Sequence, residues 1–215
     1  MRKLSNRVLS CLLGLICMLA LFPVQAFAAG AIDPNKDVTL TIEYKHNNVP
    51  VSDVTFDLYY AASVDAYAEF TLSGDFRDYP VEVNGLTTDA WKTLAETLAV
   101  YADRDQLKPM DSGKTNTQGI LSFPSQQSSL KPGLYLVVGR KLVQNGYTYT
   151  TEPFLVSLPN LDQKSDTWTY DVIAVPKHTQ TENPPAPSDE TVERRVLKVW
   201  KDDIQQSRPA EVVIR

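Results

Sequence analysis

Hydrophobic and polar residues alternate strictly along the stretch VTLTIEYKHN, which covers residues 38–47. Its apolar positions are Val38, Leu40, Ile42 and Tyr44. Because successive side chains of a strand point to opposite faces, this period of two predicts a half-buried strand. The same period returns in VTFDLYYAA, where the apolar positions are Val54, Phe56, Leu58 and Tyr60. A second strand is therefore expected directly after the turn that NNVPVSD forms.

Four later segments also have the composition of strands. They are residues 120–123, 133–139, 147–158 and 167–175. Loops rich in Gly, Pro, Asn and Asp separate them, as the chemistry of turns requires. We therefore expect a mostly β fold, a β-sandwich, over residues 33–177.

One segment, TTDAWKTLAETLAVYADRD, interrupts this β pattern. Its apolar residues recur at helical spacing, at Trp91, Leu94, Ala95, Leu98 and Tyr101. Thr88 or Asp89 can cap its start. The sequence therefore predicts one inserted amphipathic helix that covers a face or end of the sandwich, and a ligand-contacting insertion is the alternative.

The composition changes after residue 177. Residues 178–194, HTQTENPPAPSDETVER, are Pro-rich and offer little to bury, which is typical of an extended linker. Residues 195–215 begin like another β domain but supply two strands at best, too few for a core of their own. We expect an incomplete second β domain and a longer protein beyond Arg215.

The first 28 residues have the organisation of a secretory signal peptide. Arg2, Lys3 and Arg7 precede an apolar run over residues 8–24, which leads to small residues and a cleavage site after Ala28. The apolar run is short for a membrane span. The chain is therefore expected to be exported.

Cleavage after Ala28 would also remove both cysteines, Cys11 and Cys17. The remaining chain then has neither disulfides nor thiolate metal sites. It keeps 18 basic against 26 acidic residues, a net charge of −8. Such an acidic chain argues against nucleic acids or anionic membranes as the main partner.

The stretches LKVWKDD and RPAEVVIR resemble the opening of the collagen-adhesin B-type (Cna-B) repeat domains of Gram-positive surface proteins. The matching positions are Lys198, Val199, Trp200, Arg208 and Pro209. The resemblance implies that residues 195–215 are the start of a truncated Cna-B-type domain.

The stretches LKPGLYLVVG, YTYTTEPFLVSLPNLD and WTYDVIAVPK resemble the N-terminal domain of Gram-positive major pilins and related adhesins. In pilins the last strand carries the motif WxxxVxVYPK, whose lysine a sortase joins to the C-terminus of the next subunit. Four positions match this motif, namely Trp168, Val172, Pro176 and Lys177, whereas Ala174 and Val175 depart from it. The resemblance implies an Ig-like, Cna-B-like β-sandwich with Lys177 as the candidate for sortase linkage.

The sortase reaction that the resemblance implies requires an accessible, unprotonated amine at Lys177. A sortase holds the preceding subunit as a thioester, and an unprotonated amine must attack its carbonyl. Because the pKa of an ordinary lysine is about 10.4, the ammonium must lose its proton inside the enzyme, which favours an exposed lysine at a strand end. Pro176 has no N–H and can end the strand there. The alternative is a solvated lysine that protects a sheet edge.

Both families often contain an intramolecular isopeptide bond, in which a buried lysine attacks an Asn or Asp beside a second acid. In the first domain the alternation turns Lys45 outward, and Gly139 stands where many relatives have glutamate. We therefore expect no such bond there. Lys198 shares a face with Val196 and Trp200, which makes it an isopeptide lysine candidate, unless it snorkels to solvent.

Other candidate chemistry is sparse. His46 and His178 are expected in a turn and in the linker, so we expect no metal site and no cofactor. A pair of glycosidase-type carboxylates stays open, because such pairs are defined by distance in the fold. An aromatic group either forms an exposed ligand surface or packs under the helix, and its members are Tyr67, Phe70, Phe76 and Tyr79.

These observations predict a structural and adhesive protein on the cell surface or cell wall of a Gram-positive bacterium. It would be a pilin-like subunit, covalently assembled or wall-attached by sortase, and Lys177 would be a substrate rather than a catalytic residue. The expected partners are the sortase, other pilin or surface-protein subunits, and a host extracellular-matrix protein or glycan. The alternatives are a monomeric wall-anchored adhesin and a secreted carbohydrate-active enzyme.

Overall fold

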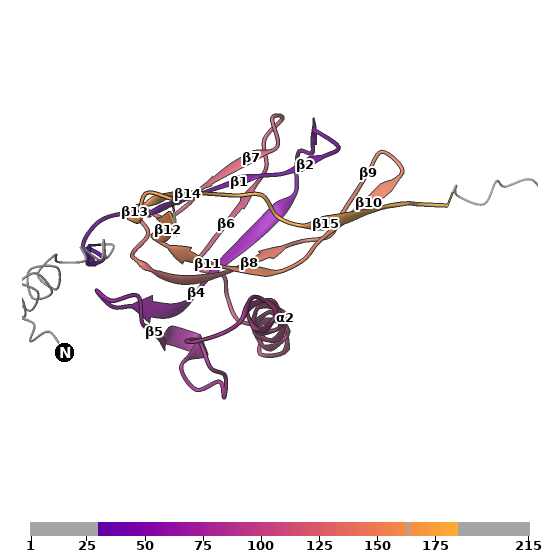
Figure 1. Ribbon diagram of the computed structural model, residues 1–215. Coiled ribbons are helices and arrows are strands. Elements are labelled where there is room, and N and C mark those ends of the chain that lie inside the picture. The colour runs from indigo at the N-terminus through magenta and orange to yellow at the C-terminus, as the bar shows by residue number, and fades with distance from the viewer. Residues whose placement is uncertain (1–29, 163, 185–215) are drawn as a thin grey trace, which may run out of the picture. The chain divides into compact units, whose positions relative to one another are not determined.

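A computed structural model describes residues 30–162 and 164–184 of the chain, in which a single long helix lies on one side of a set of strands (Figure 1). The strands before the helix are β1 (Thr39–Glu43), β2 (Lys45–His46), β3 (Val49–Pro50), β4 (Thr55–Val64) and β5 (Phe70–Leu72), followed by the short 3-10 helix η1 (Gly74–Phe76) and the long helix α2 (Thr88–Arg104). The strands after it are β6 (Asp111–Lys114), β7 (Ile120–Phe123), β8 (Gly133–Gly139), β9 (Leu142–Gln144), β10 (Tyr147–Thr151), β11 (Phe154–Leu158), β12 (Asn160–Asp162), β13 (Thr167–Thr169), β14 (Asp171–Ala174) and β15 (His178–Glu182).

Two sheets pack face to face and enclose the main core. One has the strand order β14-β1-β7, and the other has the order β11-β8-β4-β5 with β6 paired to β4. The expected alternation in β1 is confirmed, because Val38, Leu40, Ile42 and Tyr44 are all fully buried. Leu40 and Ile42 meet Phe56 and Tyr135 of the opposite sheet in this core. The mostly β, sandwich-like fold is thus confirmed.

Helix α2 covers the outer face of the five-stranded sheet, as Figure 1 shows below β8 and β11. The middle strand β8 is therefore buried on both sides. Tyr135 and Val137 point into the core between the sheets, whereas Leu134 and Leu136 pack in a second core with Leu98 of the helix. Burial on both faces explains the continuous apolar run LYLVV.

The helix begins one residue earlier than the sequence suggested. Thr87, rather than Thr88 or Asp89, is the N-cap, and its side-chain oxygen accepts a hydrogen bond from the backbone N–H of Ala90 at 3.3 Å. Such a cap satisfies one of the free N–H groups of the first turn. The expected role of the helix as a cover for the sandwich is confirmed.

The four aromatic residues Tyr67, Phe70, Phe76 and Tyr79 differ in their burial. Phe76 is fully buried, and Phe70 and Tyr79 pack against the same core as α2. Tyr67, in contrast, is 85% exposed. Three of the four side chains therefore pack in the core under the helix, as the second alternative expected.

Two predicted strands are each divided in the structure. Residues 147–158 form β10 and β11, which belong to different sheets. The break contains Pro153, which has no N–H to donate to a ladder. Residues 167–175 likewise form β13 and β14, and β14 pairs in parallel with β1. The chain therefore changes sheets at positions where the sequence indicated continuous strands.

The expected linker boundary at His178 is wrong. Residues His178–Glu182 form β15, which pairs antiparallel with β10 from Thr151↔His178 to Tyr147↔Glu182. This strand lies at a sheet edge and is largely exposed, so it has no apolar pattern that reveals it in the sequence. The first compact unit of the chain ends at Asn183.

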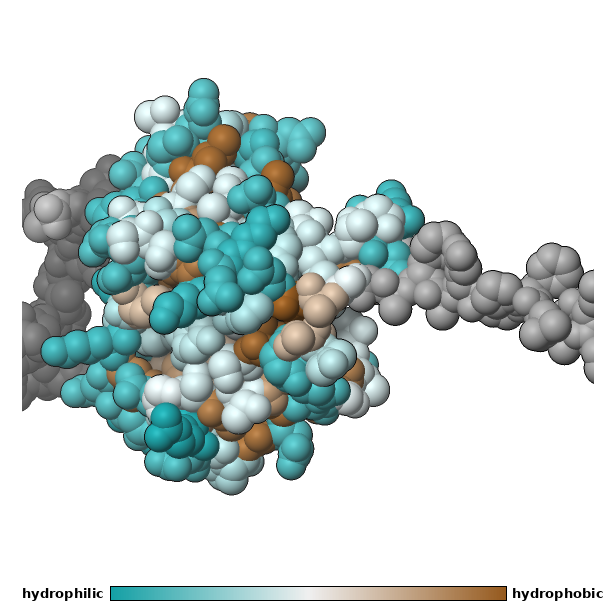
Figure 2. Space-filling model, turned by 90° about the vertical axis from the view of Figure 1, so that its left-hand side faces the viewer, coloured by the Kyte–Doolittle hydropathy of each residue, from teal (hydrophilic) through white to brown (hydrophobic). Residues whose placement is uncertain are grey.

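One face of the first unit is mainly polar. Figure 2 shows one face on which hydrophilic and neutral residues dominate and hydrophobic residues form small, separate groups. Within residues 30–162 and 164–184, no helix has both the length and the hydrophobicity to span a bilayer.

Candidate functional site

Lys177 lies where the chain crosses from β14 to β15, between two strands of different sheets. Its side chain is exposed, whereas the preceding Pro176 is buried. The backbone N–H of Glu152 donates a hydrogen bond to the Lys177 carbonyl at 3.0 Å, which holds the backbone in place. The junction therefore combines a fixed main chain with an exposed amine.

The other motif residues have different environments. Val172 is buried and stands opposite Leu40 in the parallel ladder. Trp168 lies on the separate β12–β13 ribbon, where its indole N–H donates to the carbonyl of Gly30. Val175, which departs from the motif, is 71% exposed. The motif thus anchors β14 through Val172 and Pro176 and leaves the Lys177 side chain outside.

A groove with a volume of about 580 Å³ lies beside Lys177. Its main walls are the first half of α2, strand β11 with the two residues before it, and residues 174–177, and Phe70, Leu134 and Asn160 also border it. Its apolar lining includes Trp91, Ala95, Phe154, Val156 and Pro176. Since β11 is the outermost strand of its sheet, one backbone edge also borders this apolar groove.

Charged residues stand at the rim of the groove. Lys92 Nζ of α2 lies 3.1 Å from a carboxylate oxygen of Glu152 and 3.9 Å from one of Glu96. The hydrogen bond and the charge of Glu152 raise the pKa of Lys92. Among the described residues, no carboxylate lies within ion-pair distance of Lys177. Lys92 is therefore engaged in an ion pair, whereas the Lys177 amine faces solvent.

Two residues bear on an isopeptide bond in the first domain, Lys45 and Gly139. Lys45 is exposed and forms an ion pair with Glu43 at 3.1 Å, which confirms its outward orientation. At Gly139, an added Cβ would lie 2.7 Å from Thr151 and 3.0 Å from Phe56, so no larger residue fits without movement. Buried charged residues in the described part are Asp57 and Asp111. The cleavage site at Ala28 and the candidate Lys198 lie outside the described residues.

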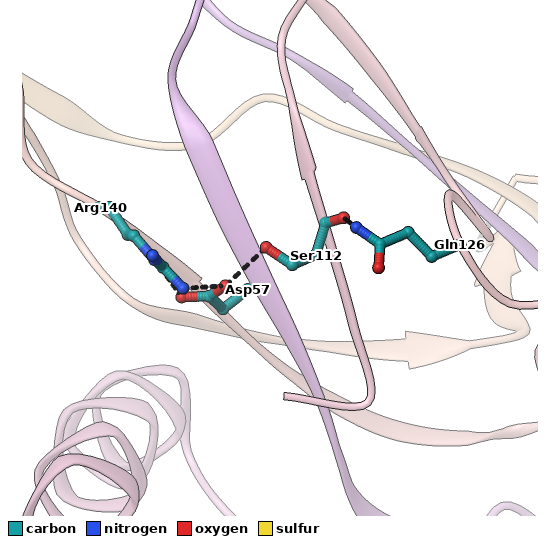
Figure 3. A network of polar contacts seen from close by, with 4 residues as sticks. All are labelled: Asp57, Ser112, Gln126 and Arg140. Atoms are coloured by element: carbon teal, nitrogen blue, oxygen red, sulfur yellow. Dashed lines mark hydrogen bonds and ion pairs between the residues drawn. The ribbon is translucent and has the colours of Figure 1, made fainter. Parts of the chain in front are cut away.

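Asp57 is held by a polar network that joins β4, β6, the residue after β8 and the loop after β7 (Figure 3). Its carboxylate accepts two hydrogen bonds from the Arg140 guanidinium, at 2.7 and 2.9 Å, and one from the Ser112 hydroxyl at 2.8 Å. Gln126 then donates to the Ser112 carbonyl at 2.8 Å. The hydrogen bonds and charge of Asp57 raise the pKa of Arg140. This arrangement neutralises an otherwise isolated buried charge.

Asp111 is the second buried carboxylate, and backbone N–H groups hold it. It accepts hydrogen bonds from the N–H of Ser112, Ser125 and Gln126, at distances from 2.7 to 3.2 Å. The carboxylate thereby fixes the loop after β7 against β6. Both buried acids are thus occupied in structural bonds, which leaves neither free to act as a general acid or base.

Two histidines that are 132 residues apart in the sequence lie in contact in the structure. His46 Nδ1 lies 3.2 Å from His178 Nε2. The sequence offered no signal for this contact, because it depends on β15. Within the described ranges, no group of three or more His, Cys, Asp or Glu residues is placed to hold a metal ion.

The described residues thus form a β-sandwich with a covering helix and an exposed lysine at a junction between two strands. The chain matches the family described as Gram-positive pilin subunit D1, N-terminal domain, over residues 32–179. It therefore belongs to that family, which makes it a pilin-like structural subunit.

Several solved structures are similar to the chain. FimP, a fimbrial protein from Actinomyces oris, is 26% identical over 70% of this chain and 31% of its own, with a TM-score of 0.42. The major pilin SpaD from Corynebacterium diphtheriae is 25% identical over 69% of this chain and 31% of its own, with a TM-score of 0.41. SpaA from the same organism is 21% identical over 66% of this chain and 30% of its own, with a TM-score of 0.39.

The chain thus spans about a third of the length of these pilins. A comparison with curated proteins finds no match.

Proposed function

We propose that this chain is a subunit of a cell-surface polymer and that a sortase joins it to another subunit through Lys177. The observation that carries this proposal is the exposed Lys177 side chain on a fixed backbone beside an apolar groove. Membership of the pilin family supports the structural role. The partners are the sortase and other pilin subunits, and a host extracellular-matrix protein or glycan is a further expected ligand of the assembled polymer.

The reaction at Lys177 is an acyl transfer. The Lys177 ammonium loses one proton to a base in the sortase, and the free amine attacks the thioester carbonyl of the arriving subunit. The carbon–sulfur bond breaks, an amide forms, the amine gives up a second proton, and the sortase thiol is restored. This chain contributes the amine and its position, and the chemistry belongs to the enzyme.

The groove beside Lys177 suits the extended end of the arriving subunit. Its walls are apolar, and the outer edge of β11 can donate and accept backbone hydrogen bonds to an added strand. A segment bound there would bring its terminal carbonyl toward residues 174–177, which border the same groove. Binding in the groove would therefore orient the acyl group before the amine attacks.

The direct test is Lys177→Arg in the organism that produces the protein. This change keeps the positive charge but removes the nucleophile, so the ladder of detergent-resistant, high-mass species in cell-wall extracts should disappear. Lys164→Arg is the matched control, because Lys164 is also exposed, and it should leave the ladder intact. An unchanged ladder in Lys177→Arg would place the linkage elsewhere. A single wall-linked band in the unaltered protein would instead support the monomeric adhesin.

The groove has its own test. Val175→Asp puts a charge on an exposed apolar residue that lines the groove, and it should slow ligation to Lys177 without changing the melting temperature. Val100→Asp is the control, because Val100 is 63% exposed on α2 and does not line the groove. Equal ligation rates for the two variants would refute a role for the groove.

We further propose that the chain is exported after cleavage at Ala28 and that a Cna-B-type domain begins at residue 195. N-terminal sequencing of the surface protein tests the first statement. In the full-length protein, loss of one ammonia or one water from the intact mass, absent in Lys198→Ala, tests the isopeptide role of Lys198. An unchanged mass in the unaltered protein would contradict that role.

A further inference from the structure

Two histidines meet where the ends of β2 and β15 come together. His46 is the last residue of β2 and His178 is the first residue of β15, and they are the two histidines of the whole chain. Both rings are partly buried, with His46 Nδ1 3.2 Å from His178 Nε2. Two imidazole nitrogens therefore face each other in a fixed position.

The surroundings of His178 determine which of its nitrogens carries the proton. His178 Nδ1 lies 3.3 Å from the carbonyl oxygen of Pro176, to which it donates a hydrogen bond as the protonated nitrogen. Its Nε2 is then left with a lone pair that points toward His46. The ring of Tyr44 packs on His178 with 4.5 Å between centroids and fixes its orientation. An imidazole held by a backbone carbonyl through its other nitrogen is the usual arrangement of a metal-binding histidine.

The distance between the two nitrogens fits a shared metal ion. Zn–N bonds of about 2.0–2.1 Å in a tetrahedral site place two nitrogen ligands about 3.3 Å apart. The observed separation is 3.2 Å. We propose that His46 and His178 together bind one divalent transition-metal ion of the class that imidazole prefers, Zn²⁺, Ni²⁺ or Cu²⁺. On binding, the His46 proton moves through solvent from Nδ1 to Nε2, so that both lone pairs face the ion.

Water can reach the pair from the side of His46, where a groove opens that His178 does not line. A groove of about 270 Å³ adjoins His46 and is lined also by Val49, Tyr149 and Gln180. In the part of the chain that the structure describes, no third histidine, cysteine or carboxylate completes the set. The protein thus supplies two ligands and water supplies the others, so the site is open and weaker than a closed four-ligand zinc site. Hard cations such as Mg²⁺, which require oxygen ligands, should not bind.

A metal at this position would connect two distant segments. It would tie the β2–β3 hairpin to the start of β15, the strand that directly follows Lys177. This inference replaces the expectation from the sequence that the chain has no metal site. It does not depend on the proposed linkage at Lys177, because it rests on the imidazole geometry alone.

Thermal unfolding of the full chain with increasing ZnCl₂ tests the proposal. At 100 times its dissociation constant, Zn²⁺ should raise the folding equilibrium constant about 100-fold. His46→Gln and His178→Gln should each abolish this shift. Val49→Ala should retain it, because Val49 lines the same groove without a ligand atom. MgCl₂ should cause no shift in any of these proteins.

A second measurement needs no variant. In the ¹⁵N spectrum of the unaltered chain, the ring nitrogens of both histidines should move on addition of ZnCl₂ and stay unchanged with MgCl₂. Ring resonances that do not move at millimolar ZnCl₂ would overturn the proposal. A thermal shift that persists in both glutamine variants would do so as well, because it would show that surface carboxylates bind the ion.

Discussion

Removing Arg140 should destabilise the first unit more than removing the charge of its partner Asp57. The Asp57 side chain is 8% exposed and the Arg140 side chain is 60% exposed. In Arg140→Met, the buried carboxylate keeps the Ser112 hydroxyl as its remaining hydrogen-bond donor. A buried charge that loses its partner costs about 3 kcal/mol of unfolding free energy. For a unit of this size, that corresponds to a melting temperature lower by roughly 6–12 °C.

Asp57→Asn should cost less, about 1 kcal/mol, because it leaves no buried charge and Arg140 can turn into solvent. The double variant should then be about 1–2 kcal/mol more stable than Arg140→Met alone. Urea unfolding of the four proteins, followed by tryptophan fluorescence, measures all three differences. Equal losses in the single variants, with an additive double variant, would refute this account of the network.

Three further predictions concern the core, one glycine and one buried tyrosine. Leu98→Ala should lower the unfolding free energy by about 2–5 kcal/mol in urea titrations, because Leu98 is fully buried, whereas Val100→Ala, 63% exposed, should change it by less than about 0.5 kcal/mol. Gly119→Ala should lower the melting temperature, because Gly119 has a φ of +71° and an added Cβ would overlap the Tyr44 carbonyl; an unchanged temperature would contradict this. Burial raises the pKa of Tyr135, so stability should be complete below pH 10 and fall above it; Tyr135→Phe should weaken this alkaline loss in unfolding measurements across pH 9–12.

The parts of the fold that local periodicity controls could be predicted from the sequence. β1, β4, β7 and α2 follow from residues such as Leu40, Phe56 and Leu98, which recur with a period of two or 3.6, and β8 follows from its continuous apolar run. The position of β15 could not be predicted, because its stability comes from backbone pairing with β10 rather than from burial. The divided strands were missed for a related reason, since apolar residues continue across a point where the chain changes sheets.

Some features of the candidate site could likewise be predicted from the sequence, and others could not. The outward orientation of Lys45 and the exposure of Lys177 follow from local pattern and from the position after a proline. The groove beside Lys177 needed the placement of α2 against β11, which no local pattern gives. The contact between His46 and His178 depends on β15 returning to the sandwich, so the sequence alone could not reveal it.

The place of Lys177 between β14 and β15 has a mechanical consequence for the proposed polymer. If tension enters at the Lys177 side chain and leaves toward the C-terminus, the backbone under load begins at residue 178. Within the described residues, the loaded part is then β15 and the two residues after it. The sandwich and its covering helix, from β1 to β14, lie outside the path of force. A pull would therefore load the backbone of β15 along its own length, while the ladder that pairs β15 with β10 carries no tension and the rest of the unit stays folded and unstressed.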